Sequence, residues 1–289
     1  MDRYNRQQII KGWDQKKLTE ARVVIYGTGT VANYAIASLA ALGVGTLEIY
    51  SHDKSNKSPS EWLHEYPQMH KAISLEKKIE AINSEVNIKG MDMVLNTYTL
   101  PLLDKPDVII DTHNNSRQRG ALAKYAKENS IPVYWTLASE NDAYLSTNLE
   151  GFARYKNKNQ NAVTSAIISG VLAEEIRKIL MPFENEAVPL NNLSYSLDFE
   201  TRFGKSRKNG HKSPKAISKH VLIVGAGALG NFVGLSSTLS NVERIDIMDF
   251  DEVDSTNLNR QILFYDAVGQ QKSSALVQKL KSINPNTEI

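Results

Sequence analysis

Short apolar runs alternate with helical patterns of apolar residues along most of this chain. Runs rich in β-branched and aliphatic residues occur at 22–26, 47–50, 107–111, 132–135, 221–224 and 244–248. Between them, apolar residues recur with helical spacing over 35–42 and 161–180, the latter ending before Pro182. Strands that alternate with helices are typical of an α/β fold with a mainly parallel sheet.

Two weaker patterns lie at the ends of the first 200 residues. Residues 193–203 alternate between apolar and polar, which predicts a closing strand. The segment that ends near Ala21 is amphipathic, and its ordinary interpretation is a solvated N-terminal helix. We expect the aromatic residues Trp135, Phe152 and Tyr155 to lie in the core or an interface.

A glycine-rich turn follows the strand at 221–224. Gly225 allows a tight strand-to-helix turn, Gly227 lets backbone amides approach a phosphate, and Gly230 lets the helix pack closely. The helix N-terminus adds a positive field for an anion. Asp249 follows about twenty residues on, where a carboxylate can hold ribose hydroxyls. The pattern indicates a Rossmann-type nucleotide site, and on its own it fits NAD as well as ATP.

Polar residues gathered after the next strand favour ATP. Asn257, Arg260, Gln261 and Lys272 lie within a short stretch. A dehydrogenase has no need of such a group, whereas an enzyme that binds a triphosphate and neutralises departing pyrophosphate does.

The stretch from Val221 to Lys272 resembles the E1-like superfamily of ubiquitin-activating-type enzymes, which includes the ThiF, MoeB and HesA adenylating proteins. The family pattern is GxGxxG, DxDxV, NLxRQ and a Lys in a VGxxK run. The matching residues are Gly225, Gly227, Gly230, Asp249, Asp251, Val253, Asn257, Arg260, Gln261 and Lys272. Their order and near lack of gaps make the match more specific than a glycine motif alone.

This resemblance implies an activity and its substrates. It implies an enzyme that uses ATP with Mg²⁺ to adenylate the C-terminal carboxylate of a ubiquitin-like or sulfur-carrier protein ending in Gly-Gly. Asp249 would then hold the ribose, and Asn257 and Gln261 would contact the triphosphate. Arg260 and Lys272 would neutralise charge in the transition state. No covalent nucleophile of the enzyme is required, because the substrate carboxylate itself attacks.

The N-terminal residues 3–7 also resemble this family, whose members begin with RYxRQ. There the second Arg contacts phosphate in the nucleotide site of the paired half. On that resemblance Arg6 is the candidate arginine finger, and its planar guanidinium suits a phosphoryl group.

The pattern occurs twice in the chain. Positions in the first copy align without gaps on Gly225, Gly227, Gly230 and Asp251; they are Gly27, Gly29, Ala32 and Asp53. Residues 75–83 similarly echo 276–284. The period is too long for a solenoid repeat. We therefore expect two Rossmann-like units related by a pseudo-twofold axis across a large interface.

The first copy lacks the residues expected to do chemistry. Ser51 replaces Asp249, and residues 54–60 hold no counterpart of the NLxRQ run. Residues 107–115 resemble the family's DxxDN motif, but Asn114 stands where the metal-side Asp belongs. A neutral amide does not supply the negative charge that Mg²⁺ prefers. We expect the first unit to be non-catalytic.

These observations predict three regions: an inactive unit at 1–204 that carries the arginine finger, a linker at 205–216, and the N-terminal part of the active unit at 217–289. The linker is polar and basic with Gly and Pro. The second copy ends at a position that corresponds to Ile88, before any DxxDN motif. We therefore expect a fragment, a truncated reading frame or one piece of a split protein.

Composition narrows the possibilities further. The chain of 289 residues contains no cysteine, which excludes disulfides, thiolate zinc sites and cysteine nucleophiles within it. The net charge of +2 predicts no nucleic-acid partner. No apolar run reaches the roughly 18 residues of a membrane span, and no signal peptide is present, so the expected location is the cytoplasm. The histidines lack ligand spacing and are interpreted as surface or satisfied polar groups, which leaves no protein metal ligand assigned.

Three alternatives remain at this point. The chain could be a non-catalytic scaffold that contributes Arg6 and a docking face, as a dimer or as a complement to another chain. It could be an NAD-dependent oxidoreductase. It could also be a superfamily relative that adenylates a modified tRNA base instead of a protein.

Overall fold

The computed structural model describes residues 2–54, 62–63, 68–113, 116–152, 160–197, 202–204 and 220–289. The elements in chain order are α1 (Asn5–Gln8), α2 (Gln15–Thr19), β1 (Arg22–Tyr26), α3 (Thr30–Leu42), β2 (Thr46–Tyr50), α4 (Lys71–Ile82), β3 (Asn87–Met91), the 3-10 turn η1 (Leu100–Leu102), β4 (Val108–Asp111), α5 (Ser116–Glu128), β5 (Val133–Ala138), β6 (Asp142–Ser146), α6 (Leu149–Phe152), α7 (Ala162–Leu180), β7 (Asn192–Ser196), β8 (His220–Val224), α8 (Ala228–Leu239), β9 (Arg244–Met248), the 3-10 turn η2 (Ser255–Asn257) and α9 (Lys272–Ile283).

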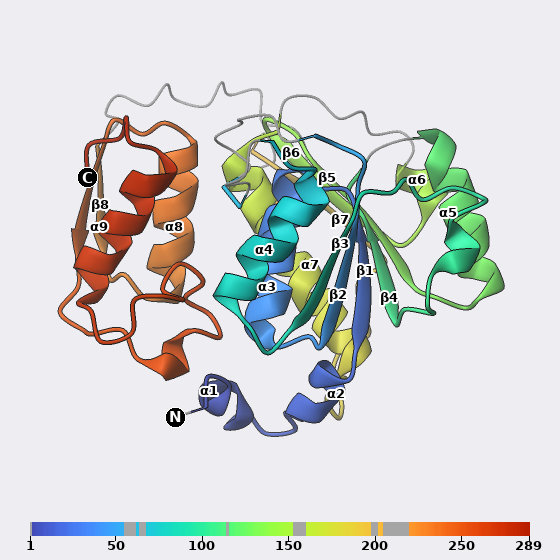
Figure 1. The fold of residues 1–289 in the computed structure, drawn as a ribbon, viewed down its shortest axis with the longest axis horizontal. Helices are drawn as coiled ribbons and strands as arrows, with labels where there is room; N and C mark the ends of the chain where they lie inside the picture. The colour runs from blue at the N-terminus through green and yellow to red at the C-terminus, as the bar shows by residue number, and fades with distance from the viewer. Residues whose placement is uncertain are drawn as a thin grey trace.

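The first half of the chain, up to residue 204, forms one seven-stranded sheet in the order β3-β2-β1-β4-β5-β6-β7. Strands β3 to β5 are parallel, and β6 and β7 are antiparallel additions at one edge. Helices α3, α4 and α7 cover one face, and α5 and α6 cover the other (Figure 1). The predicted α/β class and mainly parallel sheet are confirmed.

The second half, residues 220–289, repeats the start of this arrangement. Strands β8 and β9 form a parallel pair in register from His220↔Arg244 to Val224↔Met248, and α8 and α9 pack on one face. Among the described residues, no strand pairs with the second edge of β8. On the uncovered face, Leu222 and Val224 are 57% and 78% exposed.

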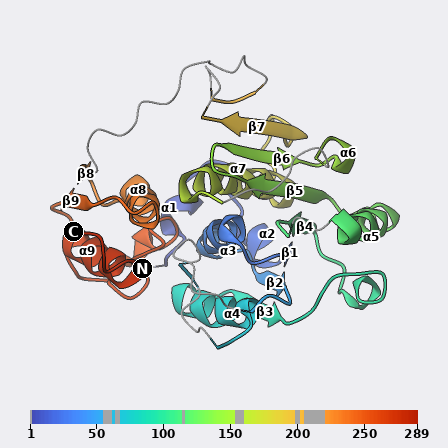
Figure 2. The ribbon, with the colours of Figure 1, turned by 90° about the horizontal axis from the view of Figure 1, so that it is seen from above.

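The two halves meet through equivalent surfaces. Tyr34 and Phe232, each five residues beyond the second glycine of its turn, stack with ring centroids 6.3 Å apart. Lys78 and Lys279 are equivalent residues of α4 and α9, and both contact the hydroxyl of Tyr265, at 2.7 and 2.9 Å. Seen from above, α8 faces α3 and α7 (Figure 2). Contacts between equivalent residues are what a twofold relation produces.

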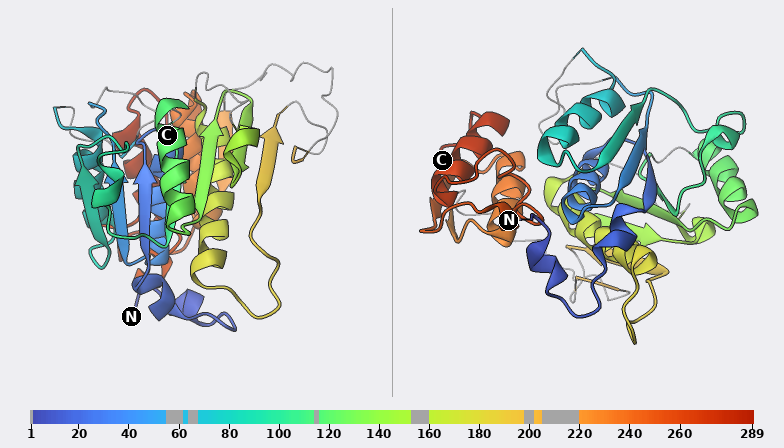
Figure 3. Two further views of the ribbon diagram at one scale, coloured as in Figure 1. Left: turned by 90° about the vertical axis from the view of Figure 1, so that its right-hand side faces the viewer. Right: turned by 60° about the horizontal axis from the view of Figure 1, so that its bottom comes forward.

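The N-terminal segment is not the single helix that the sequence suggested. It forms two short helices, α1 and α2, separated at Gly12, which has a φ of +85°. Burial also exceeds the expectation of a solvated helix, because Tyr4 is 7% exposed and accepts a hydrogen bond from Asn83 at 2.8 Å. We call residues 4–19 the N-terminal arm. Helix α2 stays against the first half, while α1 reaches η2 of the second half (Figures 1 and 3).

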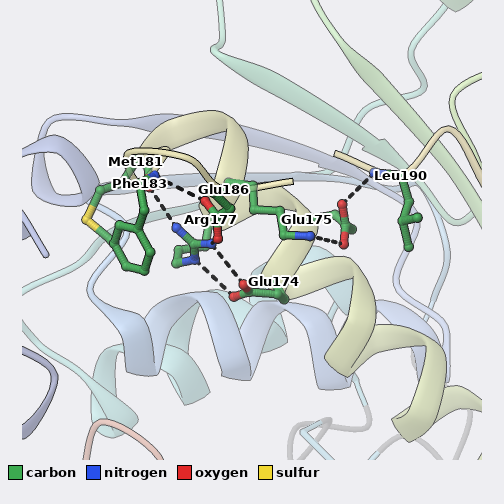
Figure 4. A network of polar contacts seen from close by, with 8 residues as sticks. Glu174, Glu175, Arg177, Met181, Phe183, Glu186 and Leu190 are labelled. Carbon is green, nitrogen blue, oxygen red and sulfur yellow. Dashed lines mark hydrogen bonds and ion pairs between the residues drawn. The ribbon is translucent and has the colours of Figure 1, made fainter. Parts of the chain in front are cut away.

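A polar network at the C-terminal end of α7 anchors this arm (Figure 4). Arg177 is buried; it donates to the carbonyl of Met181 at 2.7 Å and forms ion pairs with Glu174 and Glu186. Its guanidinium carbon also lies 4.3 Å from the ring centroid of Phe183. These contacts give the buried guanidinium both hydrogen-bond acceptors and carboxylates of opposite charge.

The network touches the arm directly. Phe183 packs on Trp13, with ring centroids 6.2 Å apart, and a Cβ on Gly12 would lie 3.5 Å from the Phe183 ring. The Met181 sulfur accepts from the backbone N–H of Asp14 at 3.1 Å. The α7 terminus therefore sets the position from which α1 reaches across to the second half.

Several smaller expectations can be compared with the structure. The strand expected over 193–203 is shorter, at Asn192–Ser196, with one further bridge from Tyr195 to Phe203. Trp135 and Phe152 are buried in the core as predicted. Tyr155, Asn114 and the linker at 205–216 lie outside the described residues.

Candidate functional site

The glycine-rich turn of the second half has the backbone that its sequence requires. Gly225 adopts a φ of +97°, which favours glycine. A Cβ on Gly230 would lie 2.0 Å from the carbonyl oxygen of Gly225. In the geometry of this turn, a side chain at position 230 would therefore clash with the backbone. The start of this helix directs backbone N–H groups outward, as at other anion sites.

Asp249 closes this turn from the end of β9. One carboxylate oxygen accepts from the backbone N–H of Ala226 at 2.6 Å, and the other accepts from Asp251 N–H at 2.8 Å. Both residues line a cavity of about 510 Å³, together with Val224, Gly225, Ile247, Met248, Phe250 and Ser273. The carboxylate thus stands where a hydroxylated group inside the cavity would meet it.

Lys272 and Asp251 form an ion pair at the start of α9. The Lys272 ammonium lies 2.7 Å from the Asp251 carboxylate, and Lys272 N–H donates to the Asp251 carbonyl at 2.9 Å. Lys272 is 7% exposed, whereas the Asp251 side chain is 53% exposed. The lysine is thus held by Asp251, a residue that lines the cavity.

Arg6 and Arg260 come from different halves and line a second cavity. This cavity, of about 430 Å³, is also lined by Gln7, Ile10, Trp13, Leu42 and Asn259. Asn259 donates to Gln7 at 2.9 Å and so fixes α1 against the second half. Partial burial and the charge of Arg6 lower the pKa of Arg260. Arg260 donates to the Thr256 carbonyl at 2.9 Å and to Asn259 Oδ1 at 2.7 Å, and the charge of Arg6 also acts on the nearby Asp254. No carboxylate appears among the described lining residues, and two guanidiniums that line one cavity favour an anion there.

Asn257 and Gln261 lie on either side of Arg260 in the loop that follows β9, and both are buried. The Asn257 side chain accepts from Asp254 N–H at 3.1 Å and thereby caps η2. Gln261 is 4% exposed, its side chain approaches Gly227, and its Oε1 has no hydrogen-bond partner among the described residues. An unpaired buried amide oxygen beside the glycine turn indicates a place where a donor belongs.

The sequence interpretation missed one residue that joins these parts. Asn231, fully buried, donates to the carbonyls of Ala226 and Gly227 at 2.9 and 3.1 Å. Its oxygen accepts from Leu263 N–H at 3.0 Å. Asn231 therefore fixes the glycine turn to the loop that carries Arg260. The signal was an asparagine four residues after the second glycine in both copies, at 33 and 231.

The first half keeps the scaffold but changes the chemistry at its strand ends. Ser51, in place of Asp249, contacts Thr28 at 3.2 Å and Asp53 at 3.0 Å, so local side chains satisfy this position. Asp111 at the end of β4 pairs with Arg119 at 2.8 Å, and both are buried. One counterpart is retained that the sequence interpretation did not notice: Lys71 begins α4 and donates its N–H to Asp53 as Lys272 does to Asp251.

The arrangement can be tested for its fit to ATP and Mg²⁺. Backbone donors at the turn, Asp249, and the cations Lys272, Arg260 and Arg6 suit the ribose and phosphates of a nucleotide. Carboxylates for a metal are scarcer in the described part of the second half. Both Asp249 oxygens accept backbone hydrogen bonds, and Asp251 pairs with Lys272. Mg²⁺ would accordingly be held mainly by phosphate oxygens.

Taken together, the fold and the site geometry define a protein of two tandem Rossmann-type units, with a cavity between the N-terminal arm and the second half that Arg6 and Arg260 line. A model of the ThiF family matches residues 4–216 and again residues 207–289. The chain belongs to the ThiF family.

Among curated relatives, the sulfur carrier protein ThiS adenylyltransferase of Bacillus subtilis is 30% identical over 143 residues, 46% of this chain and 43% of that protein. The tRNA threonylcarbamoyladenosine dehydratase of Bacillus subtilis is 37% identical over 70 residues, 24% of this chain and 28% of that protein. The aligned part spans less than half the length of these relatives. Adenylyltransferases among the relatives support adenylation chemistry at the level of the family.

Solved structures show the same fold. E. coli MccB with succinimide aligns with a TM-score of 0.60 at 17% identity, covering 75% of this chain and 74% of that chain. E. coli MccB with ATP aligns with a TM-score of 0.56 at 16% identity, covering 70% of this chain and 67% of that chain. Separately, no helix among the described residues has both the length and the apolar character needed to cross a membrane. Cytoplasmic location stays a prediction.

Proposed function

We propose that this chain binds ATP in its second half and adenylates the C-terminal carboxylate of a ubiquitin-like or sulfur-carrier protein. In this reaction a carboxylate oxygen attacks the α-phosphorus, the bond from that phosphorus to the β-phosphate oxygen breaks, and pyrophosphate leaves. The names of the adenylyltransferase relatives support the reaction type. The domain limits of 1–204 for the inactive unit and 217–289 for the ATP-binding unit belong to the same proposal.

The observation that carries the proposal is the pair Arg6 and Arg260. Arg6 comes from the N-terminal arm of the first half and Arg260 from the loop after η2 of the second half. Both arginines line the same cavity. Two guanidiniums brought together without a lining carboxylate suit a highly charged anion such as a triphosphate. A nicotinamide cofactor carries less phosphate charge and gives no reason to assemble the arm at this loop.

Each residue of the proposed site has a role that follows from its position. Gly225, Gly227 and Gly230 shape a turn whose backbone amides cradle phosphate, and Asp249 holds the ribose. Lys272 and Arg260 stabilise charge that develops on the leaving pyrophosphate. Arg6 closes the site from the arm, and Gln261 and Asn257 position the phosphates. Bound Mg²⁺ would supply further positive charge on the phosphate oxygens.

The test measures ATP binding to the full chain by calorimetry, with NAD as competitor. We expect saturable ATP binding that excess NAD does not displace. Arg260→Ala should weaken it by about 10- to 100-fold, the value of charge-assisted hydrogen bonds to a phosphate. Arg244→Ala is the matched control, because that arginine is exposed on β9 and pairs with Asp246 at 3.1 Å. Equal ATP affinity of Arg260→Ala and wild type would sink the proposal, as would displacement of ATP by NAD.

The acceptor is a separate question, because relatives include tRNA-modifying proteins. Pyrophosphate release should depend on a small protein ending in Gly-Gly. Release that instead depends on tRNA would assign the chain to the other branch of the family.

A non-catalytic or complementing role is favoured by one observation, the unpaired edge of β8 among the described residues. In that case the chain would supply Arg6 and Arg260 to a site completed by further protein. ATP binding without pyrophosphate release, restored by a second chain, would identify this arrangement.

A further inference from the structure

Two histidines and one aspartate of the first half converge at the carboxyl edge of its sheet. His52 follows β2, Asp92 follows β3, and His70 caps the start of α4. His52 Nδ1 and His70 Nδ1 lie 2.7 and 2.9 Å from the same oxygen, Asp92 Oδ1. The three ligand atoms all lie within 4.8 Å of one another. The sequence interpretation, which saw no ligand spacing among the histidines, did not anticipate this convergence.

The backbone holds the three residues together independently of their side chains. Strands β2 and β3 are parallel neighbours, in register to Tyr50↔Met91, and Ser51 N–H donates to the Met91 carbonyl at 3.1 Å. An antiparallel bridge joins Lys54 to His70. The backbone contacts therefore bring all three residues to the same edge of the sheet.

The contact to His70 is not an ordinary hydrogen bond. Its Nδ1 is buried and has no hydrogen-bond partner among the described residues, although Asp92 Oδ1 lies only 2.9 Å away. This buried nitrogen therefore lies close to the carboxylate without a hydrogen bond of its own. Two imidazole nitrogens and a carboxylate oxygen within 4.8 Å of one another form a ligand set typical of zinc-like transition metals. In a tetrahedral Zn²⁺ site, neighbouring ligand atoms lie about 3.3 Å apart, and the two nitrogen–oxygen distances here are 2.7 and 2.9 Å.

The equivalent positions of the second half differ in chemistry. Phe250 stands where His52 stands, and Gln271 where His70 stands. Phe250 is 92% exposed beside the cavity of Asp249, and Gln271 donates to Glu252 at 3.1 Å. The histidine pair is therefore a property of the first half alone, at the edge where the second half has its nucleotide cavity.

We propose that His52, His70 and Asp92 bind a divalent transition-metal cation of the Zn²⁺ class. The side chain of His52 is 67% exposed, so the fourth position is open to water, as in three-ligand zinc sites. The cation would join the ends of β2 and β3 to the start of α4. This site is separate from the nucleotide site and does not depend on its function.

The test titrates Zn²⁺ into the full chain in competition with a chromogenic chelator. We expect one equivalent to bind, and Co²⁺ to give visible absorption bands of a low-coordinate nitrogen–oxygen site. His52→Ala and Asp92→Asn should each weaken Zn²⁺ binding by more than the 10- to 100-fold that loss of an outer-shell partner costs. His70→Ala should do the same without loss of a helix cap, because the His70 side chain makes no capping hydrogen bond.

His220→Ala is the matched control, since His220 lies on β8 in the second half, where it pairs with Asp246 of β9 at 2.7 Å. It should leave Zn²⁺ affinity and stoichiometry unchanged. A thermal unfolding midpoint that rises with Zn²⁺ in wild type, and not in the double variant His52→Ala/His70→Ala, would support the site through mass action. Equal Zn²⁺ affinity of wild type and double variant, or no saturable binding up to millimolar Zn²⁺, would overturn the proposal.

Discussion

The two halves agree in their buried polar scaffold and differ at the ends of their first two strands. Asn33 and Asn231 hold the glycine turns by matching hydrogen bonds, and Lys71 and Lys272 begin equivalent helices. At the strand ends, however, Ser51 replaces Asp249. The comparison teaches that two units can share one Rossmann framework while a few residues at one edge of the sheet differ in chemistry.

A second difference concerns the far face of each sheet. Val24 and Tyr26 of β1 are buried under β4, α5 and β5, whereas their equivalents Leu222 and Val224 are 57% and 78% exposed. In the first half, the equivalent apolar face is buried by a helix that packs on it and by a parallel strand beside β1.

The largest expected difference between the halves is in the effect on stability of substitutions at Gly230 and at its equivalent, Ala32. Gly230→Ala would place a Cβ 2.0 Å from the Gly225 carbonyl, and we expect a loss of about 3 kcal/mol, at the upper end for overpacking, because the clash is with backbone. In the first half the same position is already Ala32. Ala32→Gly should cost only about 1 kcal/mol, the helix-propensity difference. Urea unfolding of both variants measures the contrast, and equal losses would contradict it.

The equivalent lysines Lys272 and Lys71 should differ in their effect on ATP affinity. Lys272→Ala should weaken ATP binding by about 10- to 100-fold, because a charged donor to phosphate is lost. Lys71→Ala removes the equivalent lysine at a similarly buried helix start and should leave ATP affinity unchanged. Calorimetry with both variants is the measurement. If Lys71→Ala were as harmful as Lys272→Ala, the first half would also take part in nucleotide binding.

The smallest effect concerns the anchor of the arm. Partial desolvation opposes the shift, but Phe183 N–H and the Arg177 guanidinium lower the pKa of Glu186 below its ordinary value of 4.5. A lowered folded-state pKa means that the stabilisation is complete above the ordinary pKa and is lost as pH falls through the lowered value. Hydrogen exchange of residues 4–19 should therefore increase modestly below about pH 4.5.

Glu186→Gln provides the control for that measurement. It should remove this part of the pH dependence while leaving a neutral acceptor beside Arg177. An arm whose exchange has the same pH dependence in wild type and Glu186→Gln would show that Glu186 does not anchor it.

Much of the fold could be predicted from the sequence because local patterns determine it. The strands at 22–26 and 221–224 and the helix over 161–180 each have a periodicity that one element satisfies. The arm was misjudged, because the break at Gly12 and the burial of Tyr4 depend on tertiary contacts with Phe183 and Asn83.

The candidate site divides in the same way. Residues of the glycine turn and Asp249 follow from spacing along one βαβ unit. The family resemblance, and not the spacing, predicted that Arg6 reaches the other half, and no pattern indicated the convergence of His52 with His70. Such contacts arise from the sheet order and the packing of the halves, which periodicity does not specify.

The stacking of Tyr34 on Phe232 has a consequence for how such a protein can change over time. A residue on the pseudo-twofold axis packs against its own duplicate, so a substitution in one copy alters the surroundings of the other and calls for a compensating change. The hydrogen bonds that Asp249 and Ser51 form at the strand ends lie within their own halves. Duplicated domains joined in this way are therefore constrained where they meet and free to acquire different ligands where they do not.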